Sequence, residues 1–140
     1  MRLLIVGGDE IGLQIATDLH RSHDITVIED DEARRAAFDT LDVKFVRGNG
    51  ADPEDLTEAG AGAVDALIAC TPNDDVNVLA CLAGKGLGAG RTLALVSRQR
   101  YLDAFAREGA MRRVGMSIDR VLWPQRILAS QIADIVRIPR

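Results

Sequence analysis

The sequence predicts a single α/β domain built on a doubly wound parallel sheet. Short apolar runs rich in β-branched residues alternate along the chain with longer segments whose apolar residues have helical spacing. The short runs are continuously apolar, which is typical of strands covered by helices on both faces. Strand–helix alternation of this kind implies parallel strands joined by right-handed crossovers. We therefore expect at least five strands in the order 3-2-1-4-5.

The expected strands can be placed in order along the chain. They are residues 3–6, 25–28, 43–46, 64–69 and 92–96, followed by a short run that ends at Pro124. Between them, helical spacing predicts helices that begin near residues 10, 33 and 74, and a last helix at 125–136. The segment 111–118 has no clear pattern.

Capping residues predict several helix ends. In NGADPEDL, Asp52 has the character of an N-cap and Pro53 fits the first helical position. Asn73 or a neighbour is expected to cap the next helix, and the glycines at 84–90 are expected to break that helix. RQRYLDAFAREGA predicts a further helix that ends at Gly109.

Composition restricts the classes of protein to consider. The chain has 140 residues, 47% of them hydrophobic, which is enough for one domain with a full core. A net charge of −4 argues against a nucleic-acid-binding protein. The sequence contains neither an apolar segment long enough to span a bilayer nor a leader pattern, so we expect a soluble, cytoplasmic protein without direct membrane insertion. Cys70 and Cys81 lie in apolar runs and are expected to be buried free thiols.

Charge is distributed unevenly along the chain. Residues 1–90 carry 7 basic and 17 acidic side chains, whereas residues 91–140 carry 10 and 4. Such a polarised molecule can pair head to tail or present its basic part to an acidic partner. Solvated helix faces would give the same pattern.

The stretch LLIVGGDEIG, residues 3–12, resembles a nucleotide-binding turn. Gly7 and Gly12 have the spacing of the first and last glycines of G-x-G-x-x-G, but Asp9 replaces the middle glycine. Gly7 would permit a tight turn, and Gly12 would permit close packing of helix on strand. A helix that begins near Glu10 would direct free N–H groups toward a ligand above the strand ends.

An acidic residue at the end of the second strand supports this interpretation. Glu29 follows Gly7 by 22 residues, where a carboxylate can accept hydrogen bonds from ribose hydroxyls and repels a 2′-phosphate. The pattern favours NAD or an adenosine nucleotide over NADP. A tight turn and a solvated acid are the structural alternative.

Several further stretches resemble the N-terminal lobe of the Trk/Ktr potassium-uptake regulators, the TrkA-N or RCK domain. VIEDDEAR is similar to the family's V-I-D-x-D-x-x-R, with Glu29, Asp31 and Arg34 in the matching places. The block from VRGNGADPEDL to GAGRT resembles G-D-x-x-D-P-x-x-L, A-G-A, D-x-x-I-A-x-T and D-E-x-N. SIDRVLWPQRILASQIADIV is similar to the family's last strand, proline and exit helix. The resemblance covers nearly the whole chain and implies a Rossmann-like fold.

The resemblance implies a regulatory protein rather than an enzyme. Such lobes form dimers and rings on the cytoplasmic face of an integral-membrane potassium translocator, and they respond to NAD(H) or ATP/ADP. It implies a TrkA-N domain at residues 1–124, and a helix at 125–140 that either contacts a second copy or links to a C-terminal lobe not contained in this sequence. The alternative is the N-terminal dinucleotide-binding domain of an NAD-dependent oxidoreductase.

The candidate cofactor-binding residues come from the glycine turn and from the matching motifs. They are Gly7, Gly8, Asp9, Glu10, Ile11, Gly12, Glu29, Asp30, Asn49, Gly50, Ala51, Cys70 and Thr71. No catalytic or metal-binding residue is predicted.

The sequence departs from the family pattern at three places. Asn49 replaces the usual Asp, which in the family lies near the adenosine. Asp9 replaces a glycine, and residues 94–97 lack the two arginines of A-R-x-R, and both of these changes affect the phosphate half of the site. Arg98 and Arg100 are the nearest possible replacements in the sequence. We therefore expect NAD(H), ATP, ADP or AMP to bind weakly or not at all, with AMP no worse than NAD and ATP the weakest.

Overall fold

The fold is one parallel sheet with helices on both faces. The computed structural model describes residues 1–123, 132, 134 and 135. Six strands form the sheet in the order β3-β2-β1-β4-β5-β6. Their bounds are β1 (Arg2–Val6), β2 (Asp24–Glu29), β3 (Val43–Arg47), β4 (Ala66–Ala69), β5 (Arg91–Leu95) and β6 (Arg120–Leu122). The predicted order of the first five strands is confirmed, and β6 pairs with β5 in parallel.

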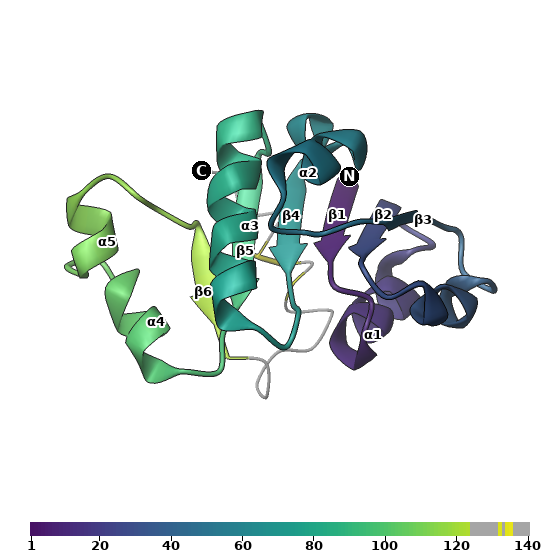
Figure 1. Ribbon diagram of the computed structural model, residues 1–140, viewed down its shortest axis with the longest axis horizontal. Coiled ribbons are helices and arrows are strands. Elements are labelled where there is room, and N and C mark those ends of the chain that lie inside the picture. The colour runs from purple at the N-terminus through teal and green to yellow at the C-terminus, as the bar shows by residue number, and fades with distance from the viewer. Residues whose placement is uncertain (124–131, 133, 136–140) are drawn as a thin grey trace.

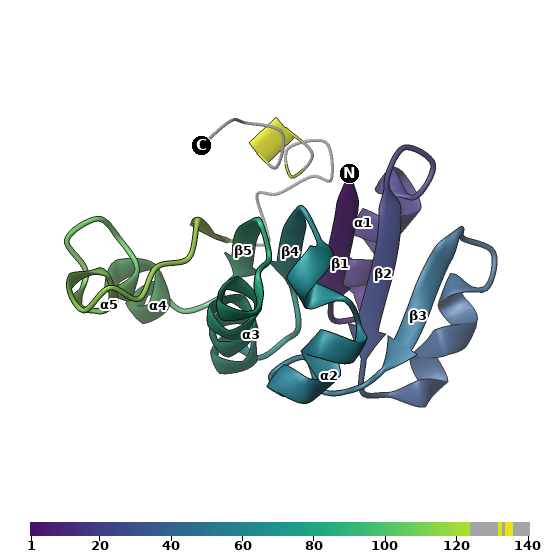
Figure 2. The same ribbon diagram turned by 90° about the horizontal axis from the view of Figure 1, so that it is seen from above.

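Helices cover the two faces unequally along the sheet. Figure 2 shows α1 (Glu10–Leu19) on one face, with α2 (Pro53–Glu58) and α3 (Asp74–Leu87) on the other. The short helices α4 (Gln99–Ala104) and α5 (Ala110–Arg113) extend sideways beyond β6 (Figure 1). Two 3-10 helices, η1 (Glu32–Phe38) and η2 (Ala61–Ala63), complete the connections. In the described part of the chain, no helix is long and apolar enough to cross a membrane.

The core consists of two layers, one on each face of the sheet. Alternate residues of β1 point to opposite faces, so Leu3 packs in the layer beneath α1 whereas Leu4 packs in the layer beneath α2 and α3. Cys70 belongs to the first layer and Cys81 to the second. Both are buried free thiols, as predicted. Burying one Leu or Ile side chain contributes about 1.5–3 kcal/mol, so the two layers supply most of the stabilisation.

One helix end differs from the sequence prediction. The helix predicted to end at Gly109 ends at Ala104, because Phe105 turns into the core and is buried. Gly109 instead precedes α5, and a Cβ there would lie 2.3 Å from the Ala104 carbonyl oxygen. The predicted end of α3 within the glycines at 84–90 is confirmed. The helix continues past Gly84, which packs against the side chain of Leu67, and ends at Leu87 with Gly88 as its left-handed C-cap.

The remaining helix predictions have mixed outcomes. Asp52 caps α2 with its side chain and Pro53 is the first helical residue, as predicted. The segment after β2 is helical but forms the 3-10 helix η1, in which only Phe38 is buried, so little packing imposes a regular α-helix. The predicted last helix lies mostly outside the described residues. Within it, Ile132 is buried in the α1-side layer and Ile135 packs against that layer.

Candidate functional site

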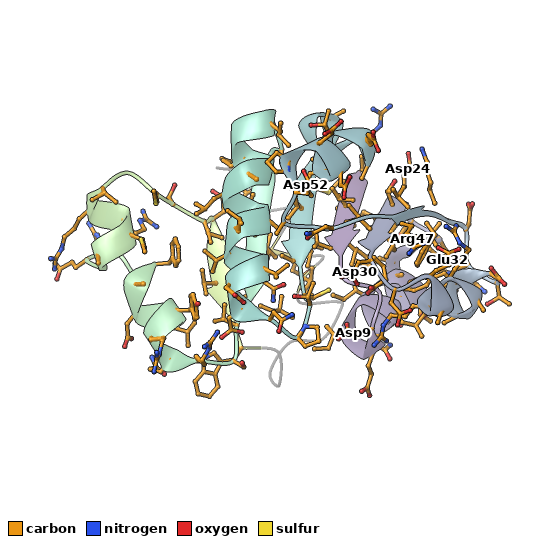
Figure 3. All side chains as sticks on the ribbon, viewed as in Figure 1. Asp9, Asp24, Asp30, Glu32, Arg47 and Asp52 are labelled. Carbon is orange, nitrogen blue, oxygen red and sulfur yellow. The ribbon has the colours of Figure 1, made fainter. Side chains whose placement is uncertain are left out.

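A pocket of about 280 Å³ lies at the carboxyl edge of the sheet, at the point between β1 and β4 where the strand order reverses. This switch point is where open α/β sheets bind ligands. Figure 3 places Asp9 and Asp30 toward this edge, and Asp24 toward the opposite one. The lining residues are Val6, Gly7, Asp9, Ile28, Glu29, Asp30, Asp31, Arg34, Gly48, Asn49, Gly50, Thr71, Pro72, Asn73 and Val76.

The pocket brings together about half of the predicted site residues. Those that line it are Gly7, Asp9, Glu29, Asp30, Asn49, Gly50 and Thr71. Those that do not line it are Gly8, Glu10, Ile11, Gly12, Ala51 and Cys70. Glu10 is exposed, Ile11 packs on the core, and the thiol of Cys70 points at the carbonyl oxygen of Val6. These three residues support the turn or lie beside it rather than face a ligand.

The turn between β1 and α1 has the tight geometry that the glycine spacing predicts. Gly7 has a φ of +110°, a conformation that residues with a Cβ rarely adopt. Its N–H donates to the carbonyl oxygen of Ile28 at 2.9 Å. A Cβ at Gly12 would lie 1.9 Å from the Gly7 carbonyl oxygen, so only glycine allows α1 to begin this close to the strand.

Glu29 holds two loops together at the end of β2. The N–H of Gly8 donates to Oε1 at 2.8 Å, and the N–H of Asp31 donates to Oε2 at 2.8 Å. The side chain is buried, and each carboxylate oxygen keeps acceptor capacity for a further donor such as a ribose hydroxyl. The sequence predicted Glu29 as a ribose ligand but not its role in fixing the glycine turn.

Asp9 projects into the pocket at the N-terminus of α1. Its Oδ1 atom is buried and has no hydrogen-bond partner among the described residues, and no side-chain hydrogen bond caps the helix. Burial raises the pKa of this carboxyl group, while the charge of Arg34 and the amides of Gly12 and Asp9 itself oppose that shift. Glu29 adds a smaller repulsion that raises the pKa further. The carboxylate is thus only partly stabilised where it lies.

Asn77 positions the loop after β4, a role that the sequence analysis did not assign. Its Oδ1 accepts from the N–H and the hydroxyl of Thr71 at 2.9 and 2.7 Å. Its Nδ2 donates to the carbonyl oxygens of Thr71 and Leu95 at 3.0 and 2.7 Å. The available signal was a buried asparagine within the otherwise apolar stretch VNVLAC, matching the last letter of D-E-x-N.

Positive charge in the pocket comes from Arg34, which the sequence analysis noted only as a motif match. Arg34 Nε lies 3.8 Å from Glu29 Oε1 and 3.9 Å from Asp31 Oδ2. Arg98 does not line the pocket: its Nε pairs with Asp74 at 3.3 Å, and its guanidinium stacks over the ring of Tyr101. Arg98 therefore does not replace the missing arginines.

The loop after β3 completes the lining. Asn49 donates its N–H to Asp55 at 2.8 Å, and its side-chain oxygen accepts from the N–H of Ala51 at 2.9 Å. A Cβ at Gly50 would lie 2.1 Å from the side chain of Val6, so the loop crosses close above β1. The substitution of Asp by Asn49 thus retains an acceptor that orders this turn.

The two sides of the pocket lining offer different groups to a ligand. One side of the pocket suits a ribose and a base. It offers the carboxylate acceptors of Glu29, the hydroxyl of Thr71 and close approach to the backbone around Gly50. At the other side, the N–H groups of Gly7 and Gly8 are already bonded within the protein, and the carboxyl group of Asp9 faces the place where helix amides would bind phosphate.

Comparisons with known proteins agree with the fold and the motifs. The TrkA-N domain family matches residues 3–116. The Trk system potassium uptake protein TrkA homolog of Archaeoglobus fulgidus is 34% identical over 139 residues, covering 99% of this chain and 31% of that protein. The chain thus spans about a third of the length of this relative.

Solved structures show the same fold at lower identity. The TrkA-N domain of inner membrane protein ybaL from Escherichia coli is 18% identical, with a TM-score of 0.73 over 96% of this chain and 95% of that one. The GsuK channel bound to NAD is 22% identical, with a TM-score of 0.66 over 86% of this chain and 21% of that one, and GsuK has also been solved with ADP. The resemblance noted in the sequence is confirmed: the chain belongs to the TrkA-N domain family.

Proposed function

We propose that this chain is a regulatory domain of a potassium transport system and that it responds to an adenosine-containing ligand. The observation that carries the proposal is the pocket at the switch point, in which buried Glu29 faces Asn49, Gly50 and Thr71. A relative that is 34% identical is named a potassium uptake protein, and a neighbour of the same fold is a channel solved with NAD.

A ligand in this pocket would act on four loops at once. The loops after β1, β2, β3 and β4 all line it, and Glu29 already links the first two through Gly8 and Asp31. A ligand that contacts Glu29 and Thr71 together would change the free-energy balance between arrangements of these loops. This is the kind of coupling that a regulatory domain requires.

We further propose that the domain works as a homodimer or a larger ring, beside an integral-membrane potassium translocator at the cytoplasmic face of the membrane. Residues 1–124 would form the TrkA-N domain, and residues 125–140 would form a helix that contacts a second copy or leads to a further lobe. The basic character of residues 91–140 and the exposed apolar side chains of Met111, Val114 and Met116 support an interaction surface near α5. Light scattering on the intact chain and on one truncated after residue 124 tests the role of the last helix, because only the intact chain should then be dimeric.

The alternative of an NAD-dependent oxidoreductase is favoured by no observation at the site. The pocket lining contains no histidine, lysine or tyrosine among the described residues. Mixing the protein with NAD and candidate hydroxy acids, and following absorbance at the nicotinamide band, provides the test. Any turnover would support the enzyme.

Two measurements together test the proposed function. Isothermal titration with NAD, NADH, ATP, ADP and AMP should detect binding of at least one of them, and Glu29→Ala should weaken every such ligand. Potassium uptake should fall in cells that lack the gene and should be restored by the wild-type gene. In cells that carry the Glu29→Ala gene instead, uptake should respond less to the ligand. Unchanged uptake in the deletion strain would contradict the proposal.

A further inference from the structure

The pocket is strongly acidic for a site that would hold phosphates. Four carboxylate side chains line it, those of Asp9, Glu29, Asp30 and Asp31. Arg34 is the one cationic side chain in the described part of the lining. Its guanidinium already lies beside Glu29 and Asp31, at 3.8 and 3.9 Å. The lining therefore carries an excess of negative charge that would repel a nucleoside di- or triphosphate.

Two amides of the glycine turn are already in use. The N–H of Gly7 donates to Ile28, and the N–H of Gly8 donates to Glu29. The amide of Gly12, in the first turn of α1, acts on the carboxyl group of Asp9 and lowers its pKa. Asp9 thus stands where an anionic ligand would meet the helix N-terminus.

One oxygen of the Asp9 carboxyl group lacks a donor. This atom, Oδ1, is buried and has no hydrogen-bond partner among the residues that the structure describes. A buried carboxylate oxygen without a partner costs free energy, which a donor on a ligand would recover. The part of the ligand that reaches Asp9 should therefore donate a hydrogen bond rather than bring a second anion.

The size of the pocket also favours a ligand without a pyrophosphate. The volume of about 280 Å³ is slightly below the range of roughly 300–1,000 Å³ that is typical of pockets for drug-sized ligands. A nucleoside is closer to this volume than a dinucleotide, which would extend past Asp9 along the N-terminus of α1.

We infer that the pocket takes an adenosine-type nucleoside whose 5′ position carries a hydrogen-bond donor without negative charge, and best of all an ammonium group. The ribose hydroxyls bind Glu29, and the 5′ donor binds the carboxyl group of Asp9. This inference rests on the proposed function, because both require an adenosine ligand. It differs from that function in naming the 5′ chemistry that the site selects.

Calorimetry with five probes tests the inference. Adenosine, 5′-amino-5′-deoxyadenosine, AMP, ADP and NAD are titrated into the full chain in EDTA at neutral pH. The amino compound should bind about tenfold or more tightly than AMP, because an ammonium–carboxylate hydrogen bond replaces a phosphate–carboxylate repulsion. Adenosine should lie between them, and ADP and NAD should be weakest.

A variant assigns the preference to Asp9. Asp9→Asn keeps a side chain of the same size and should reduce the advantage of the amino compound over AMP about tenfold, while adenosine affinity changes less than about threefold. The matched control is Asp75→Asn, which removes an exposed carboxylate from α3 outside the pocket lining and should leave the order unchanged. Circular dichroism verifies that both variants fold.

Three outcomes overturn the inference in distinguishable ways. If AMP, ADP or NAD binds more tightly than the amino compound in the wild type, the preference for a cationic 5′ group is wrong and the proposed function stands. If none of the five probes binds, the proposed nucleoside-responsive function fails as well. Equal losses in Asp9→Asn and Asp75→Asn would show that net charge alone sets the order and that Asp9 makes no specific contact.

Discussion

The turn after β1 and the loop after β4 follow neighbouring parallel strands, yet they are stabilised in opposite ways. Val6 and Ala69 are register partners, so the two loops leave the sheet side by side. In the loop after β4, Asn77 satisfies the backbone of Thr71 and the carbonyl oxygen of Leu95 within the protein. In the turn after β1, Asp9 keeps a buried oxygen without a partner among the described residues.

This difference separates a scaffold from a recognition element. A loop with all of its buried polar groups paired gains nothing further from a ligand and serves as a fixed wall. A turn with a buried unpaired acceptor is stabilised further when a donor arrives. The pocket therefore combines one rigid side with one side that is incomplete without a ligand.

The largest expected loss of stability comes from a substitution that separates α1 from the turn after β1. Gly12→Ala would place a Cβ 1.9 Å from the Gly7 carbonyl oxygen, so α1 must shift away from the strand. We expect a loss of about 3 kcal/mol or more in the free energy of unfolding, measured by urea denaturation. Gly86→Ala is the control, since nothing lies within 4 Å of a Cβ there and helix propensity should stabilise it by about 0.5–1 kcal/mol. Equal stability of the two variants would contradict this geometry.

The next effect concerns the scaffold loop. Asn77→Ala would remove all four hydrogen bonds to Thr71 and Leu95 and leave buried backbone groups unpaired. We expect a loss of about 2–3 kcal/mol in stability. Amide hydrogen exchange should become faster in the loop after β4 but not in the turn after β1. Faster exchange in both loops would mean that they are not independent.

Glu29→Ala should affect both the turn and the ligand. It leaves the N–H groups of Gly8 and Asp31 without their acceptor, which we expect to cost about 1–2 kcal/mol of stability. Adenosine, AMP and NAD should all lose the same factor in affinity, because the ribose contact is common to them. Glu58→Ala, an exposed change at the end of α2, should alter stability by less than about 0.5 kcal/mol. A loss confined to NAD would place the ribose elsewhere.

Asp9→Asn should have the smallest effect on stability, and its sign depends on pH. Burial raises the pKa of Asp9 in the folded protein above its ordinary value of 3.8, so the ionised carboxylate destabilises the fold above the folded pKa. The variant should therefore be slightly more stable than the wild type at pH 7, and this difference should shrink as pH falls through the folded pKa and disappear below 3.8. Urea midpoints at pH 7 and pH 3 measure it. A variant that is less stable than the wild type at pH 7 would show that the carboxylate is satisfied.

The sheet was predictable because strands buried on both faces leave continuous apolar runs, as in β1 and β4. The end of α4 could not be predicted, because it depends on Phe105 packing into a core layer formed by residues far away in the sequence. In the site, Gly7 and Glu29 could be identified from spacing, since the turn and strand end fix their positions. The hydrogen bond from Gly8 to Glu29 and the ion pair of Arg98 with Asp74 could not be identified in this way. Both depend on the direction in which a side chain points, which sequence spacing does not determine.

The two buried cysteines make each core layer observable without any mutation. Alkylating reagents are attacked by the thiolate, not by the thiol. Burial strongly raises the pKa of both Cys70 and Cys81, so alkylation requires the surrounding structure to open first. Cys70 lies beside the turn after β1, where its thiol donates a hydrogen bond to the carbonyl oxygen of Val6, whereas Cys81 lies in the layer beneath α3. Mass-resolved labelling rates at the two positions would therefore time the opening of each face of the sheet separately, and a ligand in the pocket should slow Cys70 more than Cys81.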